Sequence, residues 1–179
     1  SDYGIMKTIQ GDVELVKVEN NYFKRPVFDK FEEEPMLHIT GKWNYARPGQ
    51  RVELTPGETY YYSMYEKYFA QNGSKPLVFI KKDGSYTPLA KELQIKSQDL
   101  KRCFTIYEFT VPKDIDVKSN GKSEVLVGFT TGITGADAYF YDLQLYSSKD
   151  DSKTNLFVKL NFVNFGLSNF DCHFYSYRK

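Results

Sequence analysis

The stretch GETYYYSMYEKYF, residues 57–69, decides the fold class of this chain. Tyrosine, phenylalanine and threonine favour extended strands, and the Pro56-Gly57 pair at its start is typical of a turn. Successive residues of a strand point to opposite faces of the sheet. The stretch therefore predicts a strand over residues 58–68 that carries aromatic rings on both sides.

Alternation divides these rings between two faces. One face carries Tyr60, Tyr62, Met64 and Glu66, and the other carries Tyr61, Ser63, Tyr65 and Lys67. Burying one aromatic side chain removes about 150 to 250 Å² from water, so we expect the face with Met64 to fill the core. Tyr61 and Tyr65 then point outward, where their rings could stack on a sugar. The alternative is that they lie under a second layer or at a contact with another domain.

The rest of the chain shows the same kind of pattern. Short runs rich in Val, Ile, Tyr, Phe and Thr are separated by Pro, Gly, Asn and Asp, which is typical of strands joined by turns. Asp83-Gly84, for example, suits a hairpin turn because both residues tolerate positive φ. The predicted strands are 12–19, 36–41, 50–55, 58–68, 76–82, 91–96, 103–111, 123–130 and 138–146. This order predicts an all-β fold, an antiparallel β-sandwich or jelly roll.

The chain divides into three predicted parts. Residues 1–146 form the sandwich, residues 147–155 (SSKDDSKTN) form a polar linker or loop, and residues 156–179 form a C-terminal β-hairpin. The hairpin either packs on the sandwich or leads into a neighbouring domain.

Composition limits the classes of partner. The 24 Lys and Arg against 23 Asp and Glu give a formal net charge of +1, so no strong positive field attracts nucleic acid or anionic lipid. No apolar run approaches the roughly 20 residues that a membrane helix needs. The first residues, SDYGIMK, have neither an initiator Met nor the apolar run of a signal peptide, so we expect a piece of a longer protein. Cys103 and Cys172 are compatible with one disulfide or with two buried thiols.

Motifs for catalysis are not found. His38 and His173 have no second ligand at a metal-binding spacing, and the chain has no GxSxG nucleophile motif. Two catalytic carboxylates need no motif, but a sandwich of this size leaves little room for a walled cleft. We therefore expect a protein that is not an enzyme.

Four segments carry a family resemblance through their order. They are Gln10–Glu14 (QGDVE), residues 52–68 (VELTPGETYYYSMYEKY), residues 107–112 (YEFTVP) and residues 139–145 (YFYDLQL). Over about residues 5–146 the chain resembles carbohydrate-binding modules of the family 4, 9 and 22 type. Those modules are galactose-binding-like β-sandwich domains appended to bacterial glycan-degrading enzymes.

The resemblance implies where a ligand and a metal would bind. Relatives commonly carry a ring at the position of Tyr65, and their concave face binds a polysaccharide. In the family, the early glutamate and the first Asp of the final strand help to hold a structural calcium ion. Here Tyr141 replaces that first Asp, so the calcium ligands carried over are Glu14 and Asp142. No other cofactor is implied.

A second aromatic platform precedes the strand that begins at residue 50. Trp43, Tyr45, Arg47 and Gln50 could add rings and polar edges to the site, although a lone Trp in a sandwich is also suited to the core. Tyr139 shares parity with Leu143 and Leu145, which favours burial, so it is left out of the predicted site.

The leading hypothesis is a non-catalytic carbohydrate-binding module. It would hold a polysaccharide or glycan by aromatic stacking and hydrogen bonds, as an accessory module of a larger secreted or cell-surface protein such as a glycoside hydrolase. Its partners would be the glycan and a neighbouring catalytic or adhesion domain. The alternative is a protein-interaction or adhesion module of a multimodular extracellular protein, in which the outward rings form the centre of an interface.

Overall fold

The computed structural model describes residues 17–18, 21–22, 27–31, 34–40, 49–70, 74–131 and 137–157. The regular structure of these residues is almost all β-strand, and the one helical element among them is a short 3₁₀ turn, η1 (Leu100–Arg102). The predicted all-β fold is therefore confirmed. The predicted C-terminal hairpin falls largely on residues 158–179, outside the described part of the chain.

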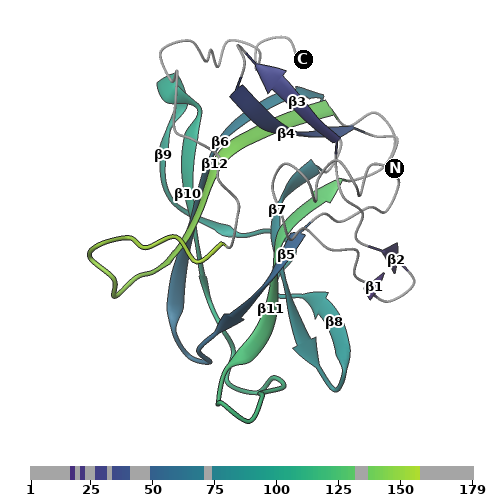
Figure 1. Ribbon diagram of the computed structural model, residues 1–179, viewed down its shortest axis with the longest axis vertical. Helices are drawn as coiled ribbons and strands as arrows, with labels where there is room; N and C mark the ends of the chain where they lie inside the picture. The colour runs from purple at the N-terminus through teal and green to yellow at the C-terminus, as the bar shows by residue number, and fades with distance from the viewer. Residues whose placement is uncertain are drawn as a thin grey trace.

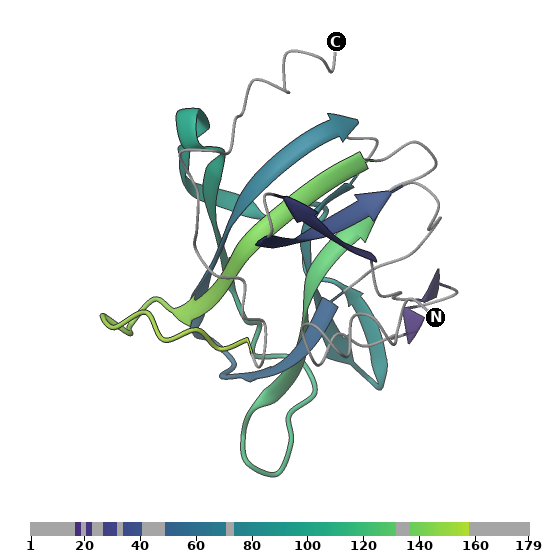
Figure 2. The same ribbon diagram turned by 45° about the horizontal axis from the view of Figure 1, so that its top comes forward.

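Two antiparallel sheets form the layers of the sandwich, as Figures 1 and 2 show. The six-stranded sheet has the order β3-β4-β12-β6-β10-β9, and the four-stranded sheet has the order β5-β11-β7-β8. The strands of the six-stranded sheet are β3 (Val27–Phe31), β4 (Glu34–Thr40), β12 (Asp137–Ser147), β6 (Thr59–Ala70), β10 (Phe104–Thr110) and β9 (Gln94–Asp99). Those of the four-stranded sheet are β5 (Gly49–Leu54), β11 (Ser123–Thr131), β7 (Ser74–Lys82) and β8 (Ser85–Pro88).

A separate two-stranded ribbon, β1 (Lys17–Val18) with β2 (Asn21–Tyr22), lies beside β8. The list of predicted strands lacks β2, β3 and β8, although the predicted hairpin at Asp83-Gly84 implied a strand at β8. Strands β3 and β8 lie at the edges of the two sheets. A short edge strand needs only one partner, so its formation depends more on its neighbour than on its own composition.

The turn at residues 55–58 connects the two sheets. The Glu58 amide donates to the Thr55 carbonyl over 3.1 Å, and Gly57 has a φ of 85°. A type II turn requires positive φ at its third position, which glycine adopts without strain. The turn was predicted correctly, but β5 and β6 on either side of it belong to different sheets and do not form a hairpin.

The Asp83-Gly84 turn does form a hairpin, between β7 and β8. Asp83 has a φ of 51° and Gly84 a φ of 80°, as a tight two-residue hairpin loop requires. The prediction for this turn is confirmed.

Aromatic residues from both sheets fill the core. Tyr62 and Met64 are buried between the layers, and the Tyr62 hydroxyl donates to the Gly128 carbonyl of β11 over 3.0 Å. The Phe129 and Phe140 rings lie 4.3 Å apart, centroid to centroid. The prediction that the face with Met64 faces inward is therefore confirmed. Each buried ring contributes roughly 4 to 6 kcal/mol of gross apolar burial.

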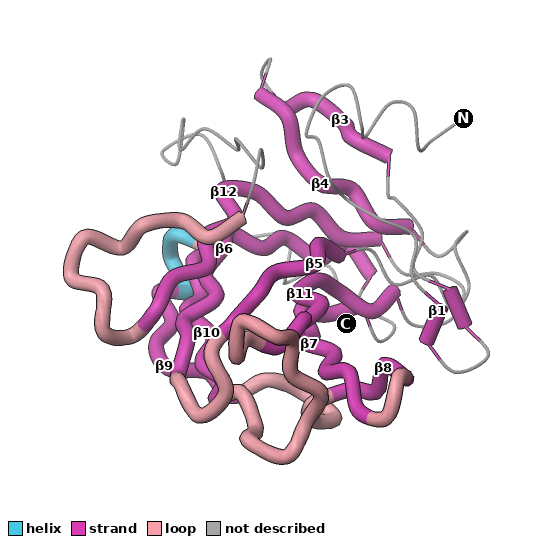
Figure 3. Tube along the Cα trace, turned by 60° about the horizontal axis from the view of Figure 1, so that its bottom comes forward, coloured by secondary structure: helices cyan, strands magenta, loops and turns pink. Residues whose placement is uncertain are grey.

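The polar segment after β12 folds back onto the sandwich. Asn155 accepts a hydrogen bond from the Leu145 amide over 3.0 Å and donates to the Leu143 carbonyl over 3.1 Å. Phe157 is buried, with its ring 5.7 Å from that of Tyr62. The described residues that follow β12, as far as Phe157, thus belong to the sandwich, and Figure 3 shows this loop in pink.

Candidate functional site

Strand register places Tyr61 on the face of the six-stranded sheet that points away from the four-stranded sheet, here called the outer face. Directly opposed residues in an antiparallel pair share a face. Tyr61 of β6 lies opposite Glu108 of β10 and opposite Tyr146 of β12. These three side chains therefore form a row across three neighbouring strands.

The Tyr61 ring has two close partners. The Tyr146 ring lies 5.6 Å away, at an interplanar angle of 70°, and the Lys96 Nζ lies 4.9 Å from the Tyr61 centroid. Edge-to-face ring pairs and cations over ring faces are both attractive arrangements. We call Tyr61, Lys96, Glu108 and Tyr146 the Tyr61 cluster.

Lys96 reaches Tyr61 because of an irregularity in β9. Ile106 of β10 lies opposite Ser97, but the next residue, Tyr107, lies opposite Ile95, so Lys96 is an extra residue in its strand. A β-bulge of this kind bends the strand and redirects a side chain. The long Lys96 side chain then crosses β10, which lies between β9 and β6.

The chemistry of the Tyr61 cluster combines rings with both signs of charge. Lys96 is exposed, Tyr61 and Glu108 are half-buried, and Tyr146 is 7% exposed. Burial, and then the nearby Tyr61, raises the pKa of the Tyr146 hydroxyl, which therefore stays neutral and able to donate. The cluster can supply stacking surface, an ammonium donor and a carboxylate acceptor.

Tyr65 lies on the same face as Tyr61, as the alternation predicts, but it is not accessible. It is 4% exposed, and its ring centroid lies 4.7 Å from that of Phe104. Ser63 and Lys67, the other residues of this set, are also buried. The expectation of an open ring at Tyr65 is therefore wrong, because both sides of β6 are buried over residues 62–68.

A second bulge, in β12, reverses the alternation that the sequence suggested. Tyr141 lies opposite Tyr65 and Gln144 opposite Ser63, so one extra residue falls between them, and Asp142 has a φ of 52°. Tyr139 therefore lies on the outer face, opposite Lys67, and is only half-buried. The prediction that Tyr139 shares a face with Leu143 and Leu145 is wrong for this reason, although its ring is partly buried against the core.

Sequence reasoning also left Tyr146 out of the site, although its outward position follows from the buried Leu145 beside it. Leu145 faces the core opposite Tyr62, so Tyr146 faces outward beside Tyr61. Lys96 was missed because its strand was predicted as 91–96, whereas β9 spans Gln94–Asp99. No signal in the sequence alone located either bulge.

Gln50 does not join the outer face. It is 3% exposed on β5 of the four-stranded sheet, in alternation with the buried Val52 and Leu54. Its side chain therefore faces the interior between the sheets, and its predicted place beside the Tyr61 strand is wrong. Trp43, Tyr45 and Arg47 lie outside the described residues, so their part in a site stays a prediction.

Asp142 is buried at the bulge and accepts a hydrogen bond from the Gln144 amide over 2.9 Å. Burial raises its pKa, an effect that the Gln144 hydrogen bond partly offsets. Calcium takes six to eight oxygen ligands, but no group of three or more acidic, His or Cys side chains gathers for a metal within the described ranges. These residues alone do not fit a calcium ion, and Glu14 lies outside them.

Glu66 is a second buried carboxylate, on the inner face of β6. It is 3% exposed, and its Oε1 accepts from the Tyr68 hydroxyl over 2.7 Å and the Tyr107 hydroxyl over 2.8 Å. Burial raises its pKa, whereas hydrogen bonds from Tyr68, Thr105 and Tyr107 act in the opposite direction. The network connects β6 to β10 inside the sandwich and is not open to a ligand.

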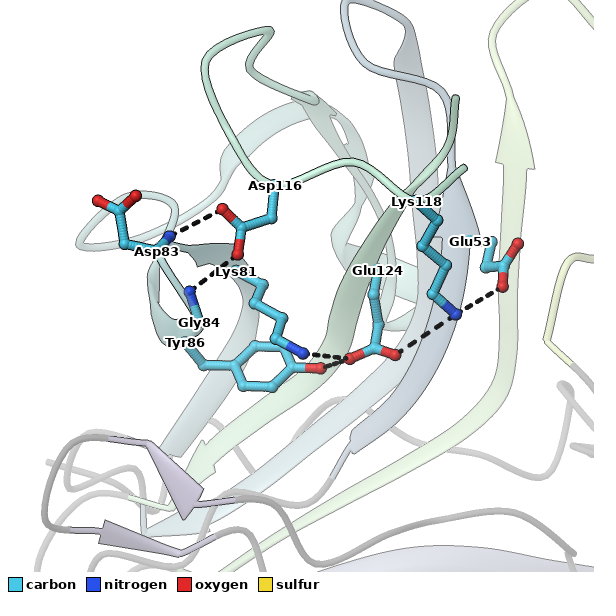
Figure 4. A network of polar contacts seen from close by, with 8 residues as sticks. All are labelled: Glu53, Lys81, Asp83, Gly84, Tyr86, Asp116, Lys118 and Glu124. Carbon is cyan, nitrogen blue, oxygen red and sulfur yellow. Dashed lines mark hydrogen bonds and ion pairs between the residues drawn. The ribbon is translucent and has the colours of Figure 1, made fainter. Parts of the chain in front are cut away.

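The four-stranded sheet carries a third polar group, shown in Figure 4. Glu124 accepts a hydrogen bond from Tyr86 and lies 3.7 Å from the Lys81 ammonium and 3.8 Å from that of Lys118. Burial opposes ionisation of Glu124, but Tyr86 and the surrounding cations still hold its pKa below the usual value. Lys118 also contacts Glu53 over 2.9 Å. These charges are already paired, so this group fits a structural role.

Cys103 is disulfide-bonded. The chain's other cysteine, Cys172, lies outside the described residues. Of the two alternatives that the sequence left open, a bridge and two free thiols, the structure has the bridge.

In the part of the chain that the structure describes, no helix is both long enough and apolar enough to cross a membrane. No protein-family model matches the sequence. A search of curated proteins also found no match.

Among the solved structures that are similar to this chain are two carbohydrate-binding modules. One, described as "CBM4 structure and function", is 15% identical with a TM-score of 0.44, and the match covers 80% of this chain and 83% of that chain. The other, described as "Family 16 Carbohydrate Binding Module-2", is 19% identical with a TM-score of 0.41, and the match covers 62% of this chain and 75% of that chain.

Proposed function

We propose that this domain is a non-catalytic carbohydrate-binding module that holds a polysaccharide on the outer face of its six-stranded sheet. The observation that carries the proposal is the Tyr61 cluster, in which two tyrosine rings lie beside an ammonium and a carboxylate. Tyrosine rings offer flat apolar surface with a polar edge, and a few polar groups beside such a surface fix a ligand's orientation. Sugars present this combination of C–H faces and hydroxyl groups.

The disulfide at Cys103 supports an extracellular location as part of a secreted or surface protein. Disulfides persist in oxidising compartments and are rare in the cytosol. A glycan-binding accessory module of a glycoside hydrolase or an adhesin would work in that setting.

Affinity electrophoresis against xylans, β-glucans, mannans and host glycans tests the proposal, with isothermal titration calorimetry on any polymer that retards the protein. We expect at least one polymer to slow migration. The control is Val117→Ala, an exposed position on the loop before β11. Absence of retardation by every polymer would count against carbohydrate binding, and turnover of any of them would contradict the non-catalytic part.

Calcium binding through Glu14 and Asp142 belongs to this proposal as a structural element. Burial of the Asp142 carboxylate supports it, because a bound cation would offset the cost of burying that charge. Thermal unfolding with added CaCl₂ and with EDTA tests it. A midpoint that rises with calcium in the parent protein but not in Asp142→Asn is the expected result.

A protein-interaction or adhesion module is the second candidate. The observation in its favour is that Ile95 and Leu100, at the β9 edge of the sheet, are 50% and 64% exposed. Exposed apolar side chains at a sheet edge suit a protein contact. A pull-down with glycan competition separates the two functions, since a partner that no sugar displaces favours the second.

A further inference from the structure

The Lys96 ammonium occupies the place where a sugar would stack on Tyr61. It lies 4.9 Å from the ring centroid, whereas Tyr146 approaches the same ring edge to face. A neutral sugar that stacks on the face under Lys96 must first displace the cation from the ring. Displacing the ammonium loses its attraction to the ring, and a neutral sugar carries no charge that would replace this attraction.

Lys96 also differs in its ion pairing from several other lysines of the described residues. Its side chain is exposed, and it makes no ion pair with any of the described residues. Lys81, Lys82 and Lys118, by contrast, are each paired with a carboxylate. An anionic ligand group could therefore bind Lys96 without breaking an existing pair.

From these observations we infer that the Tyr61 cluster selects a glycan that carries an anionic group, the carboxylate of a uronic acid or a sulfate ester. This inference rests on the proposed function. The anionic group draws the Lys96 ammonium away from the ring through a charge-assisted hydrogen bond, and the sugar ring then lies against the half-buried Tyr61.

Glu108 sets the direction in which such a sugar binds. It lies on the same face, opposite Tyr61 in the register, and repels an anionic group placed on its own side. Its carboxylate accepts hydrogen bonds from sugar hydroxyls instead. The anionic group of the ligand therefore lies at the Lys96 ammonium over Tyr61, and the hydroxyl groups lie toward Glu108 of β10.

The test uses the whole chain and polymers that share a backbone. Polygalacturonate is compared with the same polymer after reduction of its carboxyl groups, and a sulfated galactan is compared with its desulfated form. Calorimetry is run on the parent protein and on Lys96→Gln and Lys96→Arg. Lys101→Gln, an exposed lysine of η1, is the charge-matched control.

We expect at least one anionic polymer to bind more tightly than its neutral counterpart. Lys96→Gln should weaken that binding about fivefold, as the loss of an exposed charged hydrogen bond does. Lys96→Arg should restore it, and Lys101→Gln should leave it unchanged. A preference for the carboxylate pair or for the sulfate pair identifies which anionic group is recognised.

Three results would overturn the inference and leave carbohydrate binding intact. They are equal affinity for anionic and neutral polymers, tighter neutral binding in Lys96→Gln, and an equal loss in Lys101→Gln. The second result would mean that Lys96 merely covers the ring, and the third that attraction to the anionic polymer is nonspecific. If no polymer binds in either form, it is the proposed function that fails.

Discussion

The Nζ of Lys96 lies 4.9 Å from the ring centroid of Tyr61, so a side chain from the edge strand β9 covers a ring on the central strand β6. Strand β10 lies between them, and the contact exists because the β9 bulge adds one residue at Lys96. The accessible end of β6 is therefore formed by Tyr61 with its neighbours on β10 and β12 and by Lys96 of β9, whereas residues 62–68 of β6 are buried on both sides.

Tyr61→Ala should weaken glycan binding and change stability only slightly. Tyr61 is half-buried, and its ring is the centre of the outer-face cluster. Loss of one ring contact is worth about 1 kcal/mol, or about fivefold in affinity. Calorimetry measures the affinity, and Tyr61→Phe, which keeps the ring, should lose less. Equal affinities in parent and Tyr61→Ala would remove Tyr61 from the site.

Tyr65→Ala should destabilise the fold. The side chain is 4% exposed and packs against Phe104, and removing a buried aromatic ring costs about 3 to 5 kcal/mol. Urea unfolding should show a large fall in the midpoint, with a smaller fall for Tyr65→Phe. A midpoint unchanged in Tyr65→Ala would show that the ring is open to solvent in solution and would return Tyr65 to the candidate site.

Local alternation along β6 could be read from the sequence, because one face of that strand must fill the core. Tyr60, Tyr62 and Met64 are buried as predicted. Alternation alone cannot place residues on both sides of a bulge, and one extra residue near Asp142 moved Tyr139 to the outer face. Period-2 patterns carry no mark of such an insertion.

The sequence also did not indicate which strands belong to which of the two sheets. The turn at 55–58 has the residues of a tight turn, and nothing local distinguishes a turn within one sheet from a turn between two. Gln50 was misplaced for this reason. Burial of Tyr65 depends on contacts with residues distant in the chain, such as Phe104 of β10, and a strand pattern says which face a residue takes but not whether that face is covered.

The native chain should contain no free thiol. Cys103 is disulfide-bonded, and Cys172 is its one candidate partner within the chain. Thiol titration under denaturing conditions should therefore give zero before reduction. Closing a loop of about 70 residues is worth about 4 kcal/mol in the chain-entropy picture, so reduction should lower the urea midpoint. Two titratable thiols in the unreduced protein would contradict the bridge.

Asp116→Asn should weaken the β7–β8 hairpin. The two Asp116 carboxylate oxygens accept from the Asp83 and Gly84 amides, each over 2.8 Å, as Figure 4 shows. The Gly84 and Asp83 amides hold the pKa of Asp116 below 3.8, so its contribution is present above that pH and is lost as the pH falls through the lowered value.

Acid unfolding curves for Asp116→Asn and for Asp151→Asn, an exposed control, test this prediction. The Asp116 variant should be less stable at neutral pH, and its difference from the parent should shrink at the acid end. A constant difference at all pH values would mean that the carboxylate charge plays no part in holding the turn.

Glu66 should make stability fall as the pH rises through the mildly acidic range. Burial raises its folded pKa above the ordinary 4.5, although the Tyr68, Thr105 and Tyr107 hydroxyls limit the rise. Between 4.5 and the raised value the folded state binds more protons than the unfolded state, so the free energy of unfolding decreases with pH there.

The Glu66→Gln variant tests this prediction because its side chain cannot titrate. As the pH rises through this window, the free energy of unfolding of the parent should fall relative to that of the variant. Urea unfolding at a series of pH values measures it, with the exposed Glu92→Gln as the control. If stability depends on pH in the same way in the parent and in Glu66→Gln, the carboxylate has the same pKa in the folded and unfolded states, and the prediction is contradicted.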